Sequence, residues 1–424
     1  MTSSQAYADR NVEFRAIVVL YVGCLLIGQM LKPRLGGIPI TLIDLLIAGT
    51  FPLIVYRMRA RLGVYAGIVL FLLPNVLFGL AYLTHGDIDP AGLMVGLYSC
   101  YRFLFPLLIV FCYARRIGTD DRAFCLRVLL AGLGFHIVFG ILQAATLPNF
   151  ALQYGPKDLP WDYQENRLVS TFLDPNLVSS LFYGALLALL CHVASAGMPL
   201  QRHFVVIMAG AALAAALTAS RGGALGFILA FGALVLETSD LSLRKKLKWM
   251  FIGTVAAVAV LAAFIAFFGM EFIERTNRFG ASNVSVGARL VNLMTLLEVF
   301  MEAPVFGRGF NFLPYLPGVE FVMVSGNYSD GGLLYLMASV GLFGLLALTA
   351  VVYGAATSFA RPRLFLYPAA MLVLQSMTTA SMYYPLLTIF VVLFALGLDG
   401  YPRGAGHRWL SSQKSGSQAA VASA

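Results

Sequence analysis

A series of long apolar runs is the feature of this chain that most restricts its fold. Runs of roughly 17–25 apolar residues are long enough to cross the hydrocarbon core of a bilayer as helices. The chain has 424 residues, 59% of them hydrophobic and 12% charged, which is too apolar for a soluble protein of this length. We therefore predict an all-α, polytopic integral membrane protein. About twelve spans are expected, near 14–31, 38–56, 62–84, 91–113, 124–147, 176–197, 203–219, 222–237, 249–269, 330–358, 363–381 and 384–399.

The spans form one predicted transmembrane domain, residues 1–409, followed by a tail rich in Ser, Ala and Gln, residues 410–424, which we expect to be disordered. The first run has the length of a span and lacks a small-residue cleavage site, which is typical of a signal anchor. The cysteines fall inside apolar runs without metal-ligand spacing, which predicts buried thiols. HExxH, Walker, GxSxG and Asp-rich motifs are missing from the sequence, so we expect neither a metal nor a cofactor.

Basic residues are concentrated in alternate connectors. By the positive-inside rule these connectors and both termini are cytoplasmic, and the net charge of +9 then implies no nucleic-acid partner. The connectors carry Arg57, Arg59, Arg61, Arg115, Arg116, Arg122, Arg202, Arg244, Lys245, Lys246, Lys248, Arg361, Arg363, Arg403, Arg408 and Lys414.

The opposite face receives the longest polar connection of the chain, residues 270–329. Within it, residues 286–301 have the spacing of an amphipathic helix. The apolar stripe of this helix either lies on the outer bilayer interface or caps the bundle. Its members are Val286, Leu290, Leu293, Met294, Leu297 and Phe300.

Two polar segments that carry an arginine are predicted on this same face. In the first, Asp174 or Asn176 can cap the span that follows, but capping does not explain Arg167. The second is the turn Ser220-Arg221-Gly222-Gly223. It is either a helical hairpin turn, in which glycine allows tight reversal and the arginine snorkels to the interface, or a guanidinium and a helix N-terminus that together hold a diphosphate.

Two further segments of this face lie in the long connection. Arg289 borders the apolar stripe, and Arg308 follows the amphipathic helix in a glycine-rich loop. We interpret Arg275 and Arg278 as residues that contact lipid headgroups. Asp330 is either the N-cap of the next helix or a general base toward a hydroxyl group.

Polar residues inside the spans have simpler interpretations. Arg102 either pairs with Asp44 in another span or contacts a lipid phosphate. His136 and Gln143 are seven residues apart on one helix face, and we interpret them as interhelical hydrogen-bonding groups.

Taken in order, the outer-face segments resemble the O-antigen polymerase and O-antigen ligase superfamily of bacterial inner-membrane glycosyltransferases. The superfamily has an Arg-x-x-Gly-Thr-Phe-x-x-Pro-Asn segment, which Arg167 to Asn176 match except that Ser170 replaces the glycine. It also has a Ser-Arg-Gly turn between spans, as at Ser220 to Gly223.

The third signature is an arginine that opens an amphipathic helix ending in Pro-x-x-Gly-x-Gly. Arg289, Pro304, Gly307 and Gly309 match it. The resemblance covers residues 160–345, and the earlier spans match only in hydropathy.

One position distinguishes the two branches of the superfamily. Ligases carry a His-Asn pair upstream of a Gly-x-x-Gly, which Gly341 and Gly344 supply here. The matching upstream position holds Asp330-Gly331, which looks more like Wzy-type polymerases of O-antigen and exopolysaccharide. The resemblance therefore favours polymerase over ligase.

The resemblance implies a reaction between glycans on undecaprenyl pyrophosphate at the periplasmic face of the inner membrane. Arg221 and Arg289 would stabilise the leaving pyrophosphate, while Asp330 would act as base or orient the acceptor hydroxyl. The expected substrate-binding residues are Arg167, Asn176, Ser220, Arg308 and Arg102. Beyond membrane lipids, a chain-length regulator or proteins of an export complex are the partners to expect.

A lipid-linked oligosaccharide flippase or another transporter is the main rival hypothesis, because about twelve spans and a cationic cavity suit it equally well. Arginine motifs confined to one face, together with the long outer connection, favour chemistry over alternating access. A purely structural role in an export complex leaves the arginine pattern unexplained.

Overall fold

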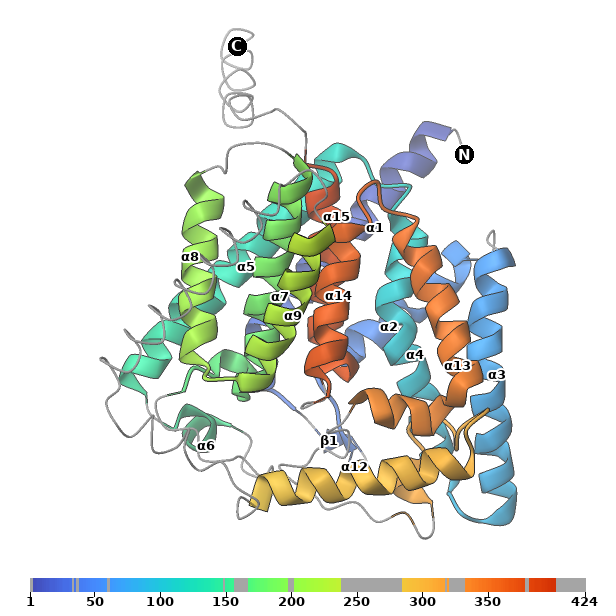
Figure 1. Cartoon of the computed structure of the whole chain (residues 1–424). Helices are drawn as coiled ribbons and strands as arrows, with labels where there is room; N and C mark the ends of the chain where they lie inside the picture. Colours follow the sequence, from blue (N-terminus) through green and yellow to red (C-terminus); the bar gives the residue numbers. More distant parts are fainter. Residues whose placement is uncertain are drawn as a thin grey trace, which may run out of the picture.

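The protein is a helical bundle (Figure 1). Apart from one hairpin of two-residue strands, β1 (Arg34–Leu35) and β2 (Ile38–Pro39), its described regular elements are helices. The computed structural model describes residues 3–32, 34–35, 38–58, 62–147, 149–155, 167–196, 202–237, 284–316, 319, 332–377 and 381–401.

Each predicted apolar run that has described residues contains a helix, although the run at 38–56 begins with strand β2. The run at 249–269 lies outside the described residues. The helices are α1 (Ser3–Ile27), α2 (Leu42–Met58), α3 (Leu62–His85), α4 (Pro90–Tyr113), α5 (Thr119–Thr146), α6 (Phe150–Tyr154), η1 (Ser170–Phe172), α7 (Pro175–Ala196), α8 (Arg202–Leu217), α9 (Arg221–Glu237), α12 (Val284–Glu302), η2 (Leu313–Tyr315), α13 (Gly332–Ala356), α14 (Arg363–Gln375), η3 (Ser381–Tyr383) and α15 (Pro385–Asp399).

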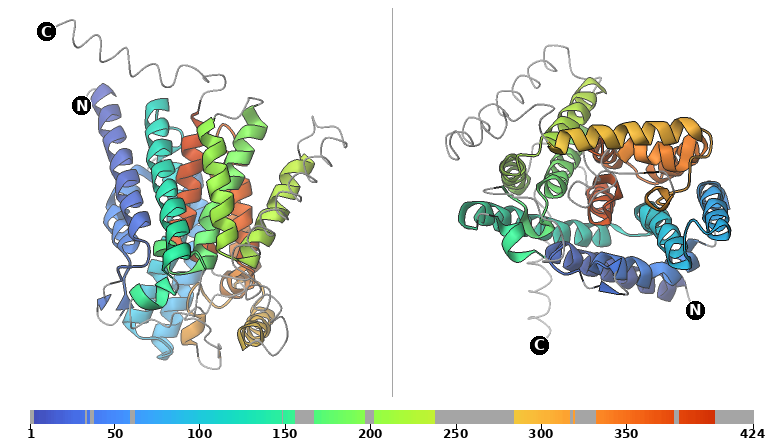
Figure 2. Two further views of the ribbon diagram at one scale, coloured as in Figure 1. Left: turned by 90° about the vertical axis from the view of Figure 1, so that its left-hand side faces the viewer. Right: turned by 90° about the horizontal axis from the view of Figure 1, so that it is seen from below.

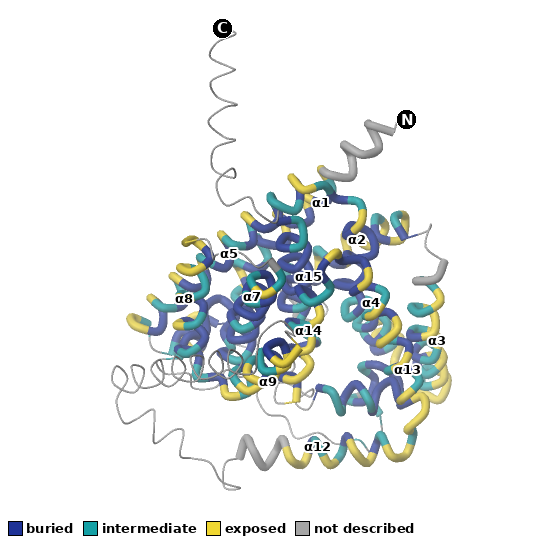
Figure 3. Tube along the Cα trace, turned by 45° about the horizontal axis from the view of Figure 1, so that its top comes forward, coloured by how far each residue is buried: buried dark blue, intermediate teal, exposed yellow. Residues whose placement is uncertain are grey.

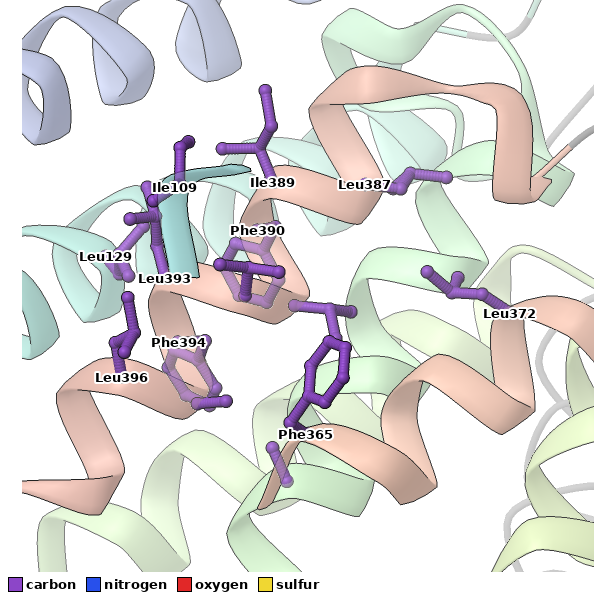
Figure 4. Packing of buried hydrophobic residues seen from close by; sticks show 14 of the residues in the cluster. Ile109, Leu129, Phe365, Leu372, Leu387, Ile389, Phe390, Leu393, Phe394 and Leu396 are labelled. Carbon is purple, nitrogen blue, oxygen red and sulfur yellow. The ribbon is translucent and has the colours of Figure 1, made fainter. Parts of the chain in front are cut away.

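Helix α15 lies at the centre of the bundle. It is apolar on every side and buried along nearly its whole length, as expected for a helix surrounded by other helices. Leu393 lies beside Ile109 of α4 and Leu129 of α5, and the rings of Phe390 and Phe394 stack on each other with centroids 5.0 Å apart (Figure 4). Helices α7 and α14 complete the surrounding layer.

The outer helices instead expose apolar side chains. On α3, Leu73, Leu77 and Leu80 are exposed, and Figure 3 shows exposed positions along the outward side of this helix. A helix that presents leucine outward while its other side packs inward is suited to contact lipid. The bundle therefore has buried apolar side chains at its centre and exposed apolar side chains on its outer helices, as expected for a helical membrane protein.

By length and composition, five of the described helices can cross a membrane: Tyr65–His85, Pro90–Tyr113, Thr119–Thr146, Pro175–Ser195 and Gly332–Ala356. Helices α8, α14 and α15 are apolar but shorter. The helical class is thus confirmed, whereas about twelve spans and the periplasmic location of residues 270–329 stay predictions.

The two ends of the bundle differ in construction. Helix α1 begins and α15 ends at one of them, while α12 lies across the other, roughly perpendicular to the remaining helices (Figures 1 and 2). Arg57 pairs with Glu13 in the first half of α1, and both Arg122 and Arg361 pair with Asp399 at the end of α15, so these basic connectors lie at one end, which is consistent with their predicted common side. The compartment that each end faces stays a prediction.

Candidate functional site

The segment that leads into α7 is held in place by side chains of α5. Gln143 accepts hydrogen bonds from the backbone N–H groups of Val169 (2.9 Å) and Ser170 (3.2 Å) through its Oε1. The Nδ1 of His136 lies 2.9 Å from the Ser170 hydroxyl. His136 and Gln143 are therefore interhelical hydrogen-bonding groups, as the sequence predicts, and they position the residues that follow Arg167.

Ser170 occupies a backbone conformation that favours glycine. Its φ is 49°, in the left-handed region that few residues other than glycine adopt readily. This explains why the resembling segments carry glycine here. In this chain, the hydrogen bond between the Ser170 hydroxyl and His136 offsets part of the strain.

Arg167 reaches the turn between α8 and α9. Its Nε donates to the carbonyl of Thr218 (2.9 Å), and a terminal nitrogen lies 3.5 Å from the carbonyl of Ala219. Next to it, the N–H of Leu168 donates to the carbonyl of Leu217 (3.0 Å). Two segments that both carry arginine in the sequence are thus joined directly, and Arg167 is fixed beside the residues that precede Ser220 and Arg221.

Ser220 performs two roles at the start of α9. Its hydroxyl accepts a hydrogen bond from the N–H of Gly223 (3.3 Å), which caps the helix. The same hydroxyl donates to Oδ1 of Asn176 at 2.9 Å. Asn176 is therefore a partner of Ser220, while Asp174 caps α7 by accepting from the N–H groups of Asn176 and Leu177.

Gly223 is explained by helix packing. A Cβ at this position would lie 2.6 Å from the Ser179 hydroxyl and 3.1 Å from the Tyr183 ring. The sequence suggested that glycine serves the reversal of the hairpin, but the left-handed residue of the turn is Ala219, with φ 51°. Gly223 instead lets α9 approach α7, which brings Arg221 close to the end of that helix.

A buried glutamine that the sequence analysis missed connects these groups to α14. The Nε2 of Gln375 donates to the carbonyl of Asn176 (2.9 Å) and to the Ser179 hydroxyl (3.2 Å). Its Oε1 accepts from the Ser180 hydroxyl at 2.7 Å, and Ser180 also contacts Ser381 at 3.1 Å. A glutamine inside an apolar run was the available signal, because polar residues in spans commonly bond across helices.

Asp330 lies outside the described residues. Gly332, two positions later, is fixed at both of its backbone groups. Its N–H donates to the carbonyl of Ser376, and its carbonyl accepts from the Tyr383 hydroxyl at 2.7 Å. Because Ser376 follows Gln375, the start of α13 adjoins the network that includes Asn176.

Helix α12 matches the predicted amphipathic helix, but it packs through a different face. Leu290, Met294 and Leu297 of the predicted stripe are exposed, whereas Leu296 and Val299 are buried. Of the predicted stripe, these three residues therefore do not cap the bundle, whereas Phe300 packs against the cluster that contains Leu296 and Val299. Arg289 belongs to α12, but its side chain is not among those that the structure describes.

Arg308 lies where the loop after α12 meets α13. It forms an exposed ion pair with Glu302 (2.8 Å), and its N–H donates to the carbonyl of Ala338. This loop fits into a break in α13 at Gly341, whose φ is 63°. A Cβ on Gly341 would lie 2.4 Å from the carbonyl oxygen of Val305. Gly341 thus has a packing role. The substrate-binding role predicted for Arg308 gains no support from the contacts of Arg308.

Arg102 pairs with Asp44, which is one of the two alternatives that the sequence left open. Its Nε lies 3.0 Å from Oδ1 of Asp44. The same carboxylate accepts from the N–H of Thr41 (2.9 Å) and from the Tyr98 hydroxyl (3.2 Å). Arg102 is therefore held within the protein, and its predicted contact with substrate stays a prediction.

Comparison with protein families finds a match to the part of the chain that contains the turn between α8 and α9. A family model described as O-antigen ligase matches residues 204–349. This segment, which is less than half of the chain, is similar to that family. No curated protein and no solved structure matches the chain. The matched segment comprises nearly all of α8 together with α9, α12 and most of α13, so it includes Ser220, Arg221, Arg289, Arg308 and Asp330.

The similarity to this family suggests a membrane protein that transfers glycans. The residues outside the match, Arg167 and Asn176, are hydrogen-bonded to the turn that lies inside it. Within the described ranges, no group of three or more His, Cys, Asp or Glu residues is arranged to hold a metal ion. Metal independence stays a prediction.

Proposed function

We propose that this protein polymerises oligosaccharide repeat units carried on undecaprenyl pyrophosphate, at the periplasmic face of the bacterial inner membrane. One observation carries the proposal: Arg167 is hydrogen-bonded to the turn that places Ser220 and Arg221 at the N-terminus of α9, inside the matched segment. A helix N-terminus and a guanidinium group together favour an anion with several oxygens, as in a diphosphate.

The reaction needs charge stabilisation and positioning more than a strong base. A hydroxyl oxygen of the acceptor sugar attacks the anomeric carbon of the donor, and the bond from that carbon to the pyrophosphate oxygen breaks. The leaving group takes the bonding electrons, so negative charge grows on the pyrophosphate in the transition state. In the proposed site, Arg221, Arg167 and Arg289 stabilise that charge, and their guanidinium groups stay protonated at any physiological pH.

Asp330 is the proposed acceptor of the hydroxyl proton, or the group that orients the hydroxyl for attack. Support comes from its neighbour in sequence: Gly332 is bonded to Ser376 and Tyr383, beside the network of Gln375 and Asn176. The Asp330-Gly331 pair in place of His-Asn also favours the polymerase over the ligase, which remains the alternative.

Purified protein in detergent tests the proposal directly. Lipid-linked repeat units supplied as both donor and acceptor should yield a ladder of longer lipid-linked glycans. Detergent has no compartments, so ladder formation there also excludes a pure transporter. Unchanged substrate from folded protein would contradict the polymerase.

A deletion strain separates the polymerase from the ligase. Loss of the polymerase leaves single repeat units on the surface anchor, because transfer of the first unit continues. Loss of a ligase removes the glycan from the anchor and leaves it on the carrier lipid. Dependence of chain length on a second protein in the same strain would test for the chain-length regulator.

A further inference from the structure

Helix α12 carries a continuous stripe of exposed apolar side chains. Its members follow one another at spacings of four, three and four residues, so they lie on one face within about 60° of arc. Their exposed fractions are 59% for Leu290, 57% for Met294, 50% for Leu297 and 68% for Met301. Four large apolar side chains in one row on a helix are unusual where water is the solvent.

The protein-facing side of α12 is a separate surface. Leu296 and Val299 are buried in a small cluster with Leu313, Tyr335 and Ala338. Asn292 is buried on the same side of the helix. The exposed stripe therefore contributes nothing to the packing of α12 on α13 and needs another partner.

The edge of the stripe carries acidic groups. Glu298 and Glu302 are exposed, and Glu302 forms its ion pair with Arg308 there. The helix thus has three sides: a packed side, an apolar exposed side and a charged exposed side. Such a cross-section suits a boundary between an apolar and an aqueous phase.

The stripe is continuous with the outer surface of a helix long enough to span a membrane. Val305 (53% exposed) and Phe306 (48% exposed) follow α12, and the Phe306 ring lies 5.4 Å from the ring of Phe343 on α13. Beyond this contact, Leu342 and Leu346 are exposed on the outward face of α13. Lipid that covers α13 would therefore reach the stripe without crossing a polar surface.

We propose that α12 lies in the interfacial layer of the bilayer, with the stripe inserted among lipid acyl chains and the acidic edge in water. Its orientation across the end of the bundle agrees with this placement (Figures 1 and 2). Lipid is the occupant because the same apolar surface continues onto α13. The depth of α12 then sets the height of its backbone, position 289 included, relative to the lipid headgroups.

Collision measurements with nitroxide labels test this placement on the full-length protein. The Cys24→Ser background removes the one half-buried cysteine, and the other four are buried. Leu297→Cys and Glu298→Cys form a matched pair of neighbours on the two exposed sides of α12, and Leu346→Cys on α13 serves as the lipid-facing reference. Each spin-labelled variant is reconstituted in vesicles of phosphatidylethanolamine and phosphatidylglycerol.

The label at position 297 should collide several-fold more with oxygen than with a water-soluble nickel chelate, as at position 346. The label at 298 should show the reverse preference. Equal access of nickel to 297 and 298 would place the stripe in water, and protection of 297 from both reagents would mean that protein covers it. Either result overturns the proposal. No activity enters the measurement, so its outcome is independent of the proposed function.

Discussion

Two groups of arginines at opposite ends of the bundle are held by different acceptors. At the end where α1 begins, Arg57 faces Glu13, while Arg122 and Arg361 share the carboxylate of Asp399. At the opposite end, Arg167 donates to backbone carbonyls of the turn between α8 and α9. A carboxylate neutralises a guanidinium, whereas carbonyl acceptors orient it without cancelling its charge.

The groups around Arg167 and Arg221 follow the same rule. Ser220, Asn176 and Gln375 are joined by hydrogen bonds between hydroxyl and amide groups. The Asp174 carboxylate lies in the same region, where it caps α7 beside Asn176. The comparison teaches that an arginine near the end of a span is a packing device or a group poised for an anion according to its partners, which its sequence position alone does not reveal.

The largest effect is expected from Asp399→Asn, at the ion-paired end. The Asp399 side chain is 1% exposed and accepts from the N–H groups of Ala360 and Arg361 as well as from Arg122. Removing its charge takes the shared carboxylate from two poorly exposed guanidinium groups, which costs about 3–5 kcal/mol of stability. Thermal unfolding in detergent should show a clearly lowered midpoint. An unchanged midpoint would mean that this end does not depend on its ion pairs.

Arg221→Ala should show the converse behaviour, with catalysis lost and stability kept. Removing one electrostatic contact to a developing charge typically lowers the rate about 10²–10³-fold. Because the Arg221 side chain is exposed at the start of α9, its truncation opens no cavity. We expect long-chain polymer to disappear from the cell surface while immunoblots show normal protein levels. Normal chain lengths would remove Arg221 from the site.

Gln375→Met tests whether the neutral network positions the site. The substitution keeps the shape of the side chain but removes its hydrogen bonds to Asn176, Ser179 and Ser180. Leaving buried polar groups unsatisfied costs about 1–3 kcal/mol. We expect a moderate loss of stability together with shorter polymer at normal protein levels. Full activity despite a lowered unfolding midpoint would make the network purely structural.

The sequence predicts what depends on local pattern. Apolar run length located the helices, a carboxylate before Pro175 indicated the cap at Asp174, and polar residues in spans indicated the roles of His136 and Gln143. The sequence predicted Arg167 and Arg221 on the same side of the membrane, but it did not predict the hydrogen bonds between Arg167 and the turn before Arg221. These inferences need no knowledge of which helices touch.

Features that depend on tertiary contacts could not be predicted in the same way. The carbonyl that accepts from Gln375 is 199 residues away in the chain. Helix α12 has two apolar sides, and periodicity alone does not say that Leu296 packs while Leu297 is exposed. Gly223 looks like a turn residue until the neighbouring Tyr183 is placed beside it.

Arg363→Ala should have the smallest effect. It is the matched control for Arg221→Ala, because Arg221 begins α9 and Arg363 of α14 contacts the residue that ends α9. Arg363 pairs with Glu237, the last residue of that helix, at 2.9 Å, and the two side chains are 43% and 46% exposed. An exposed ion pair contributes about 0–1 kcal/mol. Polymer length and unfolding midpoint should both stay near those of the unmodified protein. A loss as large as that of Arg221→Ala would show that the effect reflects any charge removed near α9, and the distinction between the two ends would fail.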